Sequence, residues 1–155
     1  MTMEGVRGGA LAAVRHVMVI DDEDDCIFVT RMVLKRAGFV GRVTTLRSGA
    51  DALAWYREHS TIDAPDVLFV DINMPVMNGF AFLGHCSTEG LLPDQRTTVV
   101  MFSSSVLPAD IERARSFPFV NGYAEKALDV DRFLNICHEH AQRTGLTSPP
   151  PTPSP

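Results

Sequence analysis

The chain has 155 residues, 45% of them hydrophobic and 21% charged, the usual composition of one globular domain. The net charge of −5 argues against a basic nucleic-acid-binding protein, and the excess negative charge lies in one run of acids at 21–25. No apolar stretch reaches the roughly 18 residues of a membrane span. The apolar run near the N-terminus is interrupted by Arg15 and His16, unlike a signal peptide.

The cysteines indicate the cellular compartment, and the local composition indicates the domain boundaries. Cys26, Cys86 and Cys137 lie far apart without metal-binding spacing, which indicates reduced thiols that pack as small hydrophobic residues in a cytoplasmic protein. We expect a loose, Gly-rich leader over 1–13, one domain over 14–143, and a disordered Pro-rich tail over 144–155.

Strand and helix patterns alternate along the domain. Short apolar runs rich in β-branched residues predict strands at 16–20, 43–46, 67–70, 98–102 and 119–124. Helical spacing of apolar residues predicts helices at 25–37, 48–58, 79–87, 108–115 and 129–141, with a long loop at 88–96. Strands that are apolar on both faces and alternate with helices predict a doubly wound α/β fold around a parallel sheet.

Polar side chains follow the predicted strands, at the edge of the sheet where such folds bind ligands. Asp21 and Asp22 follow the first strand, Asp71 the third, Ser103 the fourth and Lys126 the fifth. Each has an ordinary explanation alone, such as an acid in the first turn of a helix. Together, carboxylates about 4 Å apart would repel by roughly 4 kcal/mol per pair at an effective dielectric near 20.

Such a group of carboxylates requires a cation or bound protons. Oxygen ligands without His or Cys favour Mg²⁺. A neighbouring lysine and hydroxyl group can neutralise and orient an anion. This combination of groups suits an aspartate that accepts a phosphoryl group.

Four motifs occur in the order and spacing of one protein family: VMVIDDED, VLFVDINMPVMNG, VVMFSSS and NGYAEK. Over about residues 14–142 the chain resembles the receiver domain of two-component response regulators. It is similar to stand-alone, chemotaxis-regulator-like members, and especially to those associated with bacteriophytochromes. The resemblance implies a flavodoxin-like fold with five parallel strands in the order 2-1-3-4-5.

The resemblance also implies the roles of the acidic residues. Asp71 would be the phosphoacceptor. Asp22, Asp71 and the backbone carbonyl of Asn73 would bind Mg²⁺, and Asp21 would do so directly or through water.

Three further residues receive roles from the resemblance. Ser103 and Lys126 would contact the phosphoryl group and assist its transfer, and Tyr123 would form the conformational switch with Ser103. The family usually has Pro after the lysine, often with a cis bond, but this chain has Ala127. Because a cis bond without proline costs about 2.5–4 kcal/mol, we expect a trans bond there.

These features predict a cytoplasmic single-domain response regulator that catalyses only its own phosphorylation and dephosphorylation. The phosphoryl group would come from a histidine kinase or a phosphotransfer protein, and the output would be contact with a downstream protein, without nucleic acid or membrane. The chain would be a monomer or a homodimer through the surface of the fourth helix, fifth strand and fifth helix. Candidate anchors there are Ile111, Phe117, Phe119 and Tyr123, although Phe117 and Phe119 fit a core position equally well.

Three alternatives differ in chemistry. The chain would be a phosphotransfer intermediate if it passed its phosphoryl group onward. An aspartate-nucleophile phosphatase would commonly carry D-x-D, but Asn73 stands two residues after Asp71. A flavodoxin-like cofactor binder would need a phosphate-binding loop after the first strand, where this chain has acids.

Overall fold

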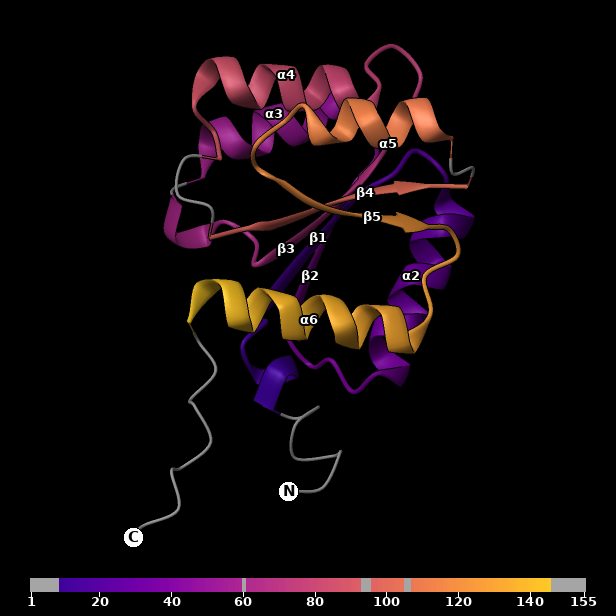
Figure 1. The fold of residues 1–155 in the computed structure, drawn as a ribbon, viewed down its shortest axis with the longest axis vertical. Coiled ribbons are helices and arrows are strands. Elements are labelled where there is room, and N and C mark those ends of the chain that lie inside the picture. The colour runs from indigo at the N-terminus through magenta and orange to yellow at the C-terminus, as the bar shows by residue number, and fades with distance from the viewer. Residues whose placement is uncertain (1–8, 60, 93–95, 105–106, 146–155) are drawn as a thin grey trace, which may run out of the picture.

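A computed structural model of the chain describes residues 9–59, 61–92, 96–104 and 107–145. Within these residues, one parallel sheet has the order β2-β1-β3-β4-β5 (Figure 1). The fold and strand order implied by the resemblance are therefore confirmed. The strands are β1 (His16–Ile20), β2 (Arg42–Leu46), β3 (Val67–Asp71), β4 (Thr98–Ser103) and β5 (Val120–Glu125). The helices are α2 (Asp24–Arg36), α3 (Gly49–Glu58), η1 (Thr61–Asp63, 3-10), α4 (Gly79–Glu89), α5 (Pro108–Arg115) and α6 (Val130–Thr144).

The helices cover both faces of the sheet. In Figure 1, α3, α4 and α5 lie above the strands and α2 and α6 lie below them. Met18, Leu68 and Phe82 belong to the apolar cluster on the first side, which we call the α4 cluster. Phe69 and Phe133 belong to the cluster on the second side, the α6 cluster. Because strands β1, β3 and β4 are buried along their whole length, the apolar runs in the sequence are explained by burial on two faces.

Side-chain caps begin α3 and α6 where the sequence predicts them. The Ser48 hydroxyl oxygen accepts a hydrogen bond from the Asp51 amide at 3.0 Å, and the Asp129 carboxylate accepts one from the Arg132 amide at 2.7 Å. Helix α4 continues to Glu89 and ends at Gly90, whose φ of 65° favours glycine. The loop before β4 is accordingly shorter than predicted.

The N-terminal segment differs from the expectation of a loose leader. Residues 9–12 are helical, and the Ala10 and Val14 side chains are buried in the α6 cluster with Phe39. Their small apolar side chains are removed from water in this cluster, which accounts for the order of the segment. Residues 1–8 and most of the Pro-rich tail, 146–155, lie outside the described residues, and α6 runs through Thr144, where the tail was expected to begin. None of the described helices is long and apolar enough to cross a membrane.

Candidate functional site at the strand ends

Three aspartates meet at the carboxyl ends of two adjacent strands. Asp71 is the last residue of β3, and Asp21 and Asp22 follow β1, which pairs with β3 in parallel. One carboxylate oxygen from each lies within 4.8 Å of the other two. Asp21 and Asp71 are buried, with 0% and 2% of their surface exposed. The tertiary fold thus brings the three predicted acids into one partly closed site.

Lys126 joins this site from the loop after β5. Its ammonium nitrogen lies 2.7 Å from Asp21 Oδ2 and 3.2 Å from Asp71 Oδ1. The backbone N–H of Lys126 donates to the carbonyl oxygen of Ser103 at 2.7 Å, which fixes the loop against the end of β4. The Lys126 ammonium also lies 5.4 Å from the centre of the Phe102 ring.

The carboxylate oxygens of the site differ in how many hydrogen bonds they accept. The Glu23 amide donates to Asp21 Oδ1 at 3.0 Å, and the Asn73 amide donates to Asp71 Oδ1 at 3.3 Å. By contrast, Asp22 Oδ1 and Asp71 Oδ2 are buried and accept no hydrogen bond from any described donor. Buried anionic oxygens without partners are costly, and a hard cation satisfies them.

Burial and neighbouring charges both shift the pKa values of Asp71 and Lys126. Burial raises the pKa of Asp71 to about 7, and the negative charge of Asp21 adds to this rise while Lys126 opposes it. Burial by itself lowers the pKa of Lys126, but its hydrogen bond with Asp21 and the charge of Asp71 hold that pKa above the usual value. The raised pKa of Lys126 favours its charged form, and the raised pKa of Asp71 reflects the crowding of carboxylates in a buried site.

Ser103 and Tyr123 lie on neighbouring strands beside the acids. Ser103 is fully buried at the end of β4, opposite Glu125, while Tyr123 is half-buried opposite Met101. Burial raises the pKa of the Tyr123 phenol, and a hydrogen bond with Ser103 lowers it to a smaller extent. The two hydroxyl groups predicted to form a switch are thus in contact.

The Lys126–Ala127 peptide bond is cis, so the expectation of a trans bond is wrong. That expectation considered only the local preference of a non-proline bond. In the folded chain the bond lies between two fixed points, because Lys126 reaches Ser103 and the acids while Leu128 is buried. Tertiary contacts therefore determine the conformation of this loop.

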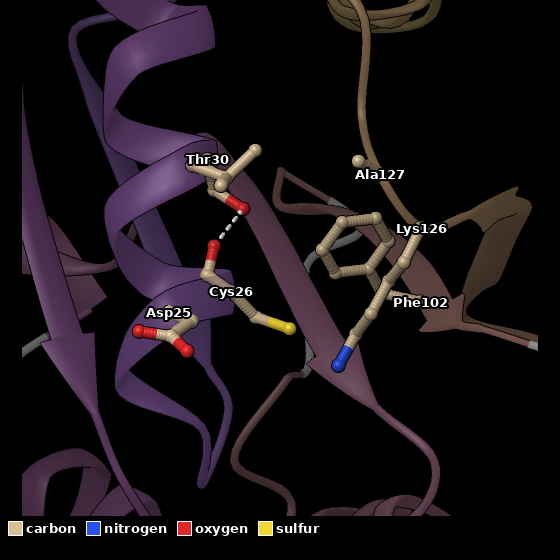
Figure 2. Close-up of a pocket in the computed structure, with 7 residues that line it drawn as sticks. Asp25, Cys26, Thr30, Phe102, Lys126 and Ala127 are labelled. Atoms are coloured by element: carbon tan, nitrogen blue, oxygen red, sulfur yellow. Dashed lines mark hydrogen bonds between the residues drawn. The ribbon is translucent and has the colours of Figure 1, made fainter.

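A small apolar cavity of about 130 Å³ adjoins the site (Figure 2). It is lined by Asp25, Cys26, Val29, Thr30, Phe102, Lys126 and Ala127. Cys86 and Cys137 are buried as predicted, but Cys26 is partly exposed in the wall of this cavity, with its sulfur directed towards Lys126. Burial raises the pKa of Cys26 to about 11, which keeps the thiol neutral. Helical periodicity gave no signal that Cys26 would face the site.

Comparison with known proteins agrees with this geometry. The family model described as the response regulator receiver domain matches residues 17–138. The chain belongs to this family. Receiver domains of two-component response regulators act in signalling, so the resemblance found in the motifs is confirmed.

Individual relatives differ in how much of their length they share. The virulence sensor protein BvgS of Bordetella bronchiseptica is 30% identical over 138 residues, covering 87% of this chain but 11% of that protein. A two component response regulator from Cytophaga hutchinsonii has a TM-score of 0.78 at 24% identity, covering 83% of this chain and 98% of that one. The phosphorylated cyanobacterial phytochrome response regulator RcpA has a TM-score of 0.64 at 23% identity, covering 90% and 99%. The two solved structures support the fold.

Proposed function

We propose that this receiver domain accepts a phosphoryl group on Asp71, as a cytoplasmic single-domain response regulator that signals by protein contact. One observation supports this most: the buried Asp71 carboxylate lies 3.2 Å from the Lys126 ammonium and close to two further acids. Phosphoryl transfer depends mainly on positioning and charge neutralisation.

The donor set fits Mg²⁺. Asp21, Asp22 and Asp71 supply only oxygen atoms, and Asp22 Oδ1 and Asp71 Oδ2 are buried without hydrogen-bond donors. In this proposal Asp22 and Asp71 hold the ion with the backbone carbonyl of Asn73, and Asp21 contacts it directly or through water. When bound, Mg²⁺ neutralises charge on the carboxylates and on the incoming phosphoryl group.

Phosphoryl transfer to Asp71 forms one bond to phosphorus and breaks another. A carboxylate oxygen of Asp71 attacks the phosphorus atom, and the P–N bond of a phosphohistidine donor breaks. The imidazole keeps the electron pair and takes up a proton, while Asp71 becomes an acyl phosphate. In dephosphorylation, water attacks phosphorus and releases inorganic phosphate, which regenerates the carboxylate. Lys126 pairs with a phosphoryl oxygen, and Ser103 donates a hydrogen bond to another.

The phosphoryl group would change the protein surface through Ser103. Movement of the Ser103 hydroxyl towards the phosphate would alter its contact with Tyr123 on β5. Tyr123 lies with Ile111 along a groove between α5 and β5. We propose the surface of α5, β5 and α6 as the contact for a downstream protein or a second copy of the chain.

A second candidate is a phosphotransfer intermediate in a multi-step relay. The match to a segment within a sensor protein favours it, because that segment is part of a signal-receiving chain. The two candidates differ in the fate of the phosphoryl group. An intermediate passes ³²P to a histidine-containing phosphotransfer protein within minutes, whereas a terminal regulator loses it mainly as inorganic phosphate.

Mass spectrometry tests the assignment of the phosphoacceptor. Incubation with acetyl phosphate and Mg²⁺ should add about 80 Da, one phosphoryl group, to the intact protein. Asp71→Asn should abolish this addition, while Asp51→Asn, at an exposed aspartate of α3, should leave it unchanged. Full labelling of Asp71→Asn would contradict the proposal. Continuous release of phosphate from added phosphate esters would instead support a phosphatase.

A further inference from the structure

Strand β5 contains one residue more than the β4 segment that it pairs with. Val99 pairs with Val120, but the next residue, Val100, pairs with Gly122, so Asn121 has no partner in the register. A residue inserted in this way is a β-bulge, which changes the faces that later side chains occupy. The bulge lies five residues before Lys126.

The two strands show the effect of this insertion. Strand β4 alternates regularly, since Val99 packs in the α4 cluster and Val100 in the α6 cluster. In β5, Val120 and Tyr123 both pack against the α4 cluster although they are three residues apart. Residues at an odd spacing share a face only where an extra residue interrupts the alternation. Asn121 is that residue.

The position of Lys126 depends on the same change of face. After the bulge, Ala124 packs in the α6 cluster, and Lys126 follows two residues later with its ammonium group near the Phe102 ring of that cluster. Figure 2 shows the Lys126 side chain passing beside Phe102. Without the extra residue, Tyr123 would face the α6 cluster and Lys126 would begin on the opposite face.

A side-chain hydrogen bond holds the bulge. The Val99 N–H donates to Asn121 Oδ1 at 2.8 Å, although the other hydrogen bonds of a strand pair run between backbone groups. Val99 is buried, with 1% of its surface exposed, so its N–H requires an acceptor. The Asn121 side chain supplies the oxygen atom at the point where the register shifts.

We propose that Asn121 is a positioning residue for phosphoryl transfer: its side-chain carbonyl stabilises the β5 bulge that directs Lys126 to Asp71 and Tyr123 to Ser103. This inference rests on the proposed function of Asp71. It assigns to an exposed residue outside the acidic site a role in the geometry of that site. Asn121 acts through Lys126 and Tyr123 without touching the reacting atoms.

The experiment compares variants of the whole 155-residue chain that keep or remove the acceptor oxygen. Asn121→Ala removes it, Asn121→Asp keeps it, and Asn135→Ala makes the same change at an exposed asparagine of α6. Amide hydrogen exchange of Val99 reports the bond directly. We expect exchange about fivefold faster in Asn121→Ala, the size of one modest hydrogen bond, with rescue in Asn121→Asp and no change in Asn135→Ala.

The rate of Asp71 labelling by acetyl phosphate with Mg²⁺ reports the position of Lys126. Asn121→Ala should label about fivefold more slowly than the unmodified chain, on the same scale of one hydrogen bond. In a background that carries both Lys126→Ala and Tyr123→Ala, Asn121→Ala should have no further effect, because its role passes through these two residues.

The outcomes separate the two proposals. If the unmodified chain takes up no phosphoryl group, the proposed function fails, whatever the result for Asn121. If the chain is labelled, and Asn121→Ala labels at the same rate or changes the background with both Lys126→Ala and Tyr123→Ala further, the positioning role is overturned. An unchanged Val99 exchange rate in Asn121→Ala would also overturn it.

Discussion

The ammonium nitrogen of Lys126 lies 3.2 Å from Oδ1 of Asp71. The same nitrogen is 2.7 Å from Asp21 Oδ2, so one positive charge is shared between two buried carboxylates. Asp22 adds a third carboxylate to this cluster, so one ammonium group faces three acidic side chains. This imbalance makes the site receptive to a cation, and it makes the stability of the fold sensitive to any change of charge there.

Lys126→Met should strongly destabilise the fold when Mg²⁺ is absent. Removing one partner of a buried ion pair leaves uncompensated charge and typically costs about 3–5 kcal/mol. Millimolar Mg²⁺ should recover part of the loss, because the ion supplies positive charge at the same carboxylates. Urea unfolding with and without Mg²⁺ measures both effects. Lys35→Met, at an exposed lysine of α2, is the control and should change stability little.

Asp22→Asn should raise the melting temperature without Mg²⁺ and reduce the further rise that Mg²⁺ produces. Without the ion, removal of one of three clustered negative charges should raise the melting temperature. With the ion, the unmodified chain should gain several degrees, since Mg²⁺ binds only the folded state, and Asp22→Asn should gain less. Thermal unfolding across a Mg²⁺ titration tests this, with the exposed Asp25→Asn as control. A melting temperature insensitive to Mg²⁺ in the unmodified chain would contradict a preformed metal site.

Ser103→Ala should separate phosphoryl uptake from the structural response. Ser103 is hydrogen-bonded with Tyr123, so its hydroxyl can transmit a change at Asp71 to β5. Addition of beryllofluoride and Mg²⁺ should shift the amide NMR signals of Asp71, Tyr123 and α5 in the unmodified chain. In Ser103→Ala the shift should remain at Asp71 and weaken at Tyr123, while Ser104→Ala should resemble the unmodified chain. Equal Tyr123 shifts in all three proteins would exclude this route.

Gly79→Ala should be far more harmful than Gly49→Ala. A Cβ at Gly79 would lie 2.4 Å from the Asp71 carbonyl oxygen, which belongs to fixed backbone beside the site. A Cβ at Gly49 would meet the Met77 sulfur at 2.7 Å, and that flexible side chain can move away. We expect Gly79→Ala to cost about 2–3 kcal/mol, and denaturant unfolding of both variants measures the difference. An equal loss of unfolding free energy in the two variants would contradict this prediction, because it would mean that the backbone at Asp71 can move to accommodate the Cβ.

His140 should make the fold less stable in mild acid. It is buried, its Nδ1 lies 2.8 Å from Thr98 Oγ1, and burial lowers its pKa although Asp66 opposes this. Below about pH 6.5, the usual histidine value, the unfolded chain therefore binds a proton that the folded chain excludes, and stability falls as pH falls. His140→Gln should lose less stability than the unmodified chain between pH 7.5 and pH 5.5.

Two comparisons isolate the contribution of His140. His138→Gln, at a less buried position of the same helix, is the matched control and should leave the contribution of His140 in place. The pKa of Asp71, raised to about 7, acts with the opposite sign, since stability from this group falls as pH rises. Stability must therefore be compared between variants at each pH. Identical slopes in the unmodified chain and His140→Gln would contradict the prediction.

The sequence by itself determined the fold class and the members of the acidic site. Strands such as Val67–Asp71 are buried on both faces, so their apolar runs carry a strong local signal. In a parallel sheet the carboxyl ends of strands lie along one edge, so placing Asp21, Asp71 and Lys126 there required only the order of elements. Side-chain caps such as Ser48 act within a few residues, and they were predicted for the same reason.

Only the tertiary structure decided features that depend on contacts distant in the sequence. The bulge at Asn121 depends on the Val99 amide, the cis bond at Lys126 lies between contacts to other strands, and Ala10 is buried in the α6 cluster, which includes Phe39 and Phe133. None of these contacts leaves a local period or composition in the chain. Periodicity reports which face a residue takes within its own element, whereas register and loop conformation are set by the partner that the fold brings alongside.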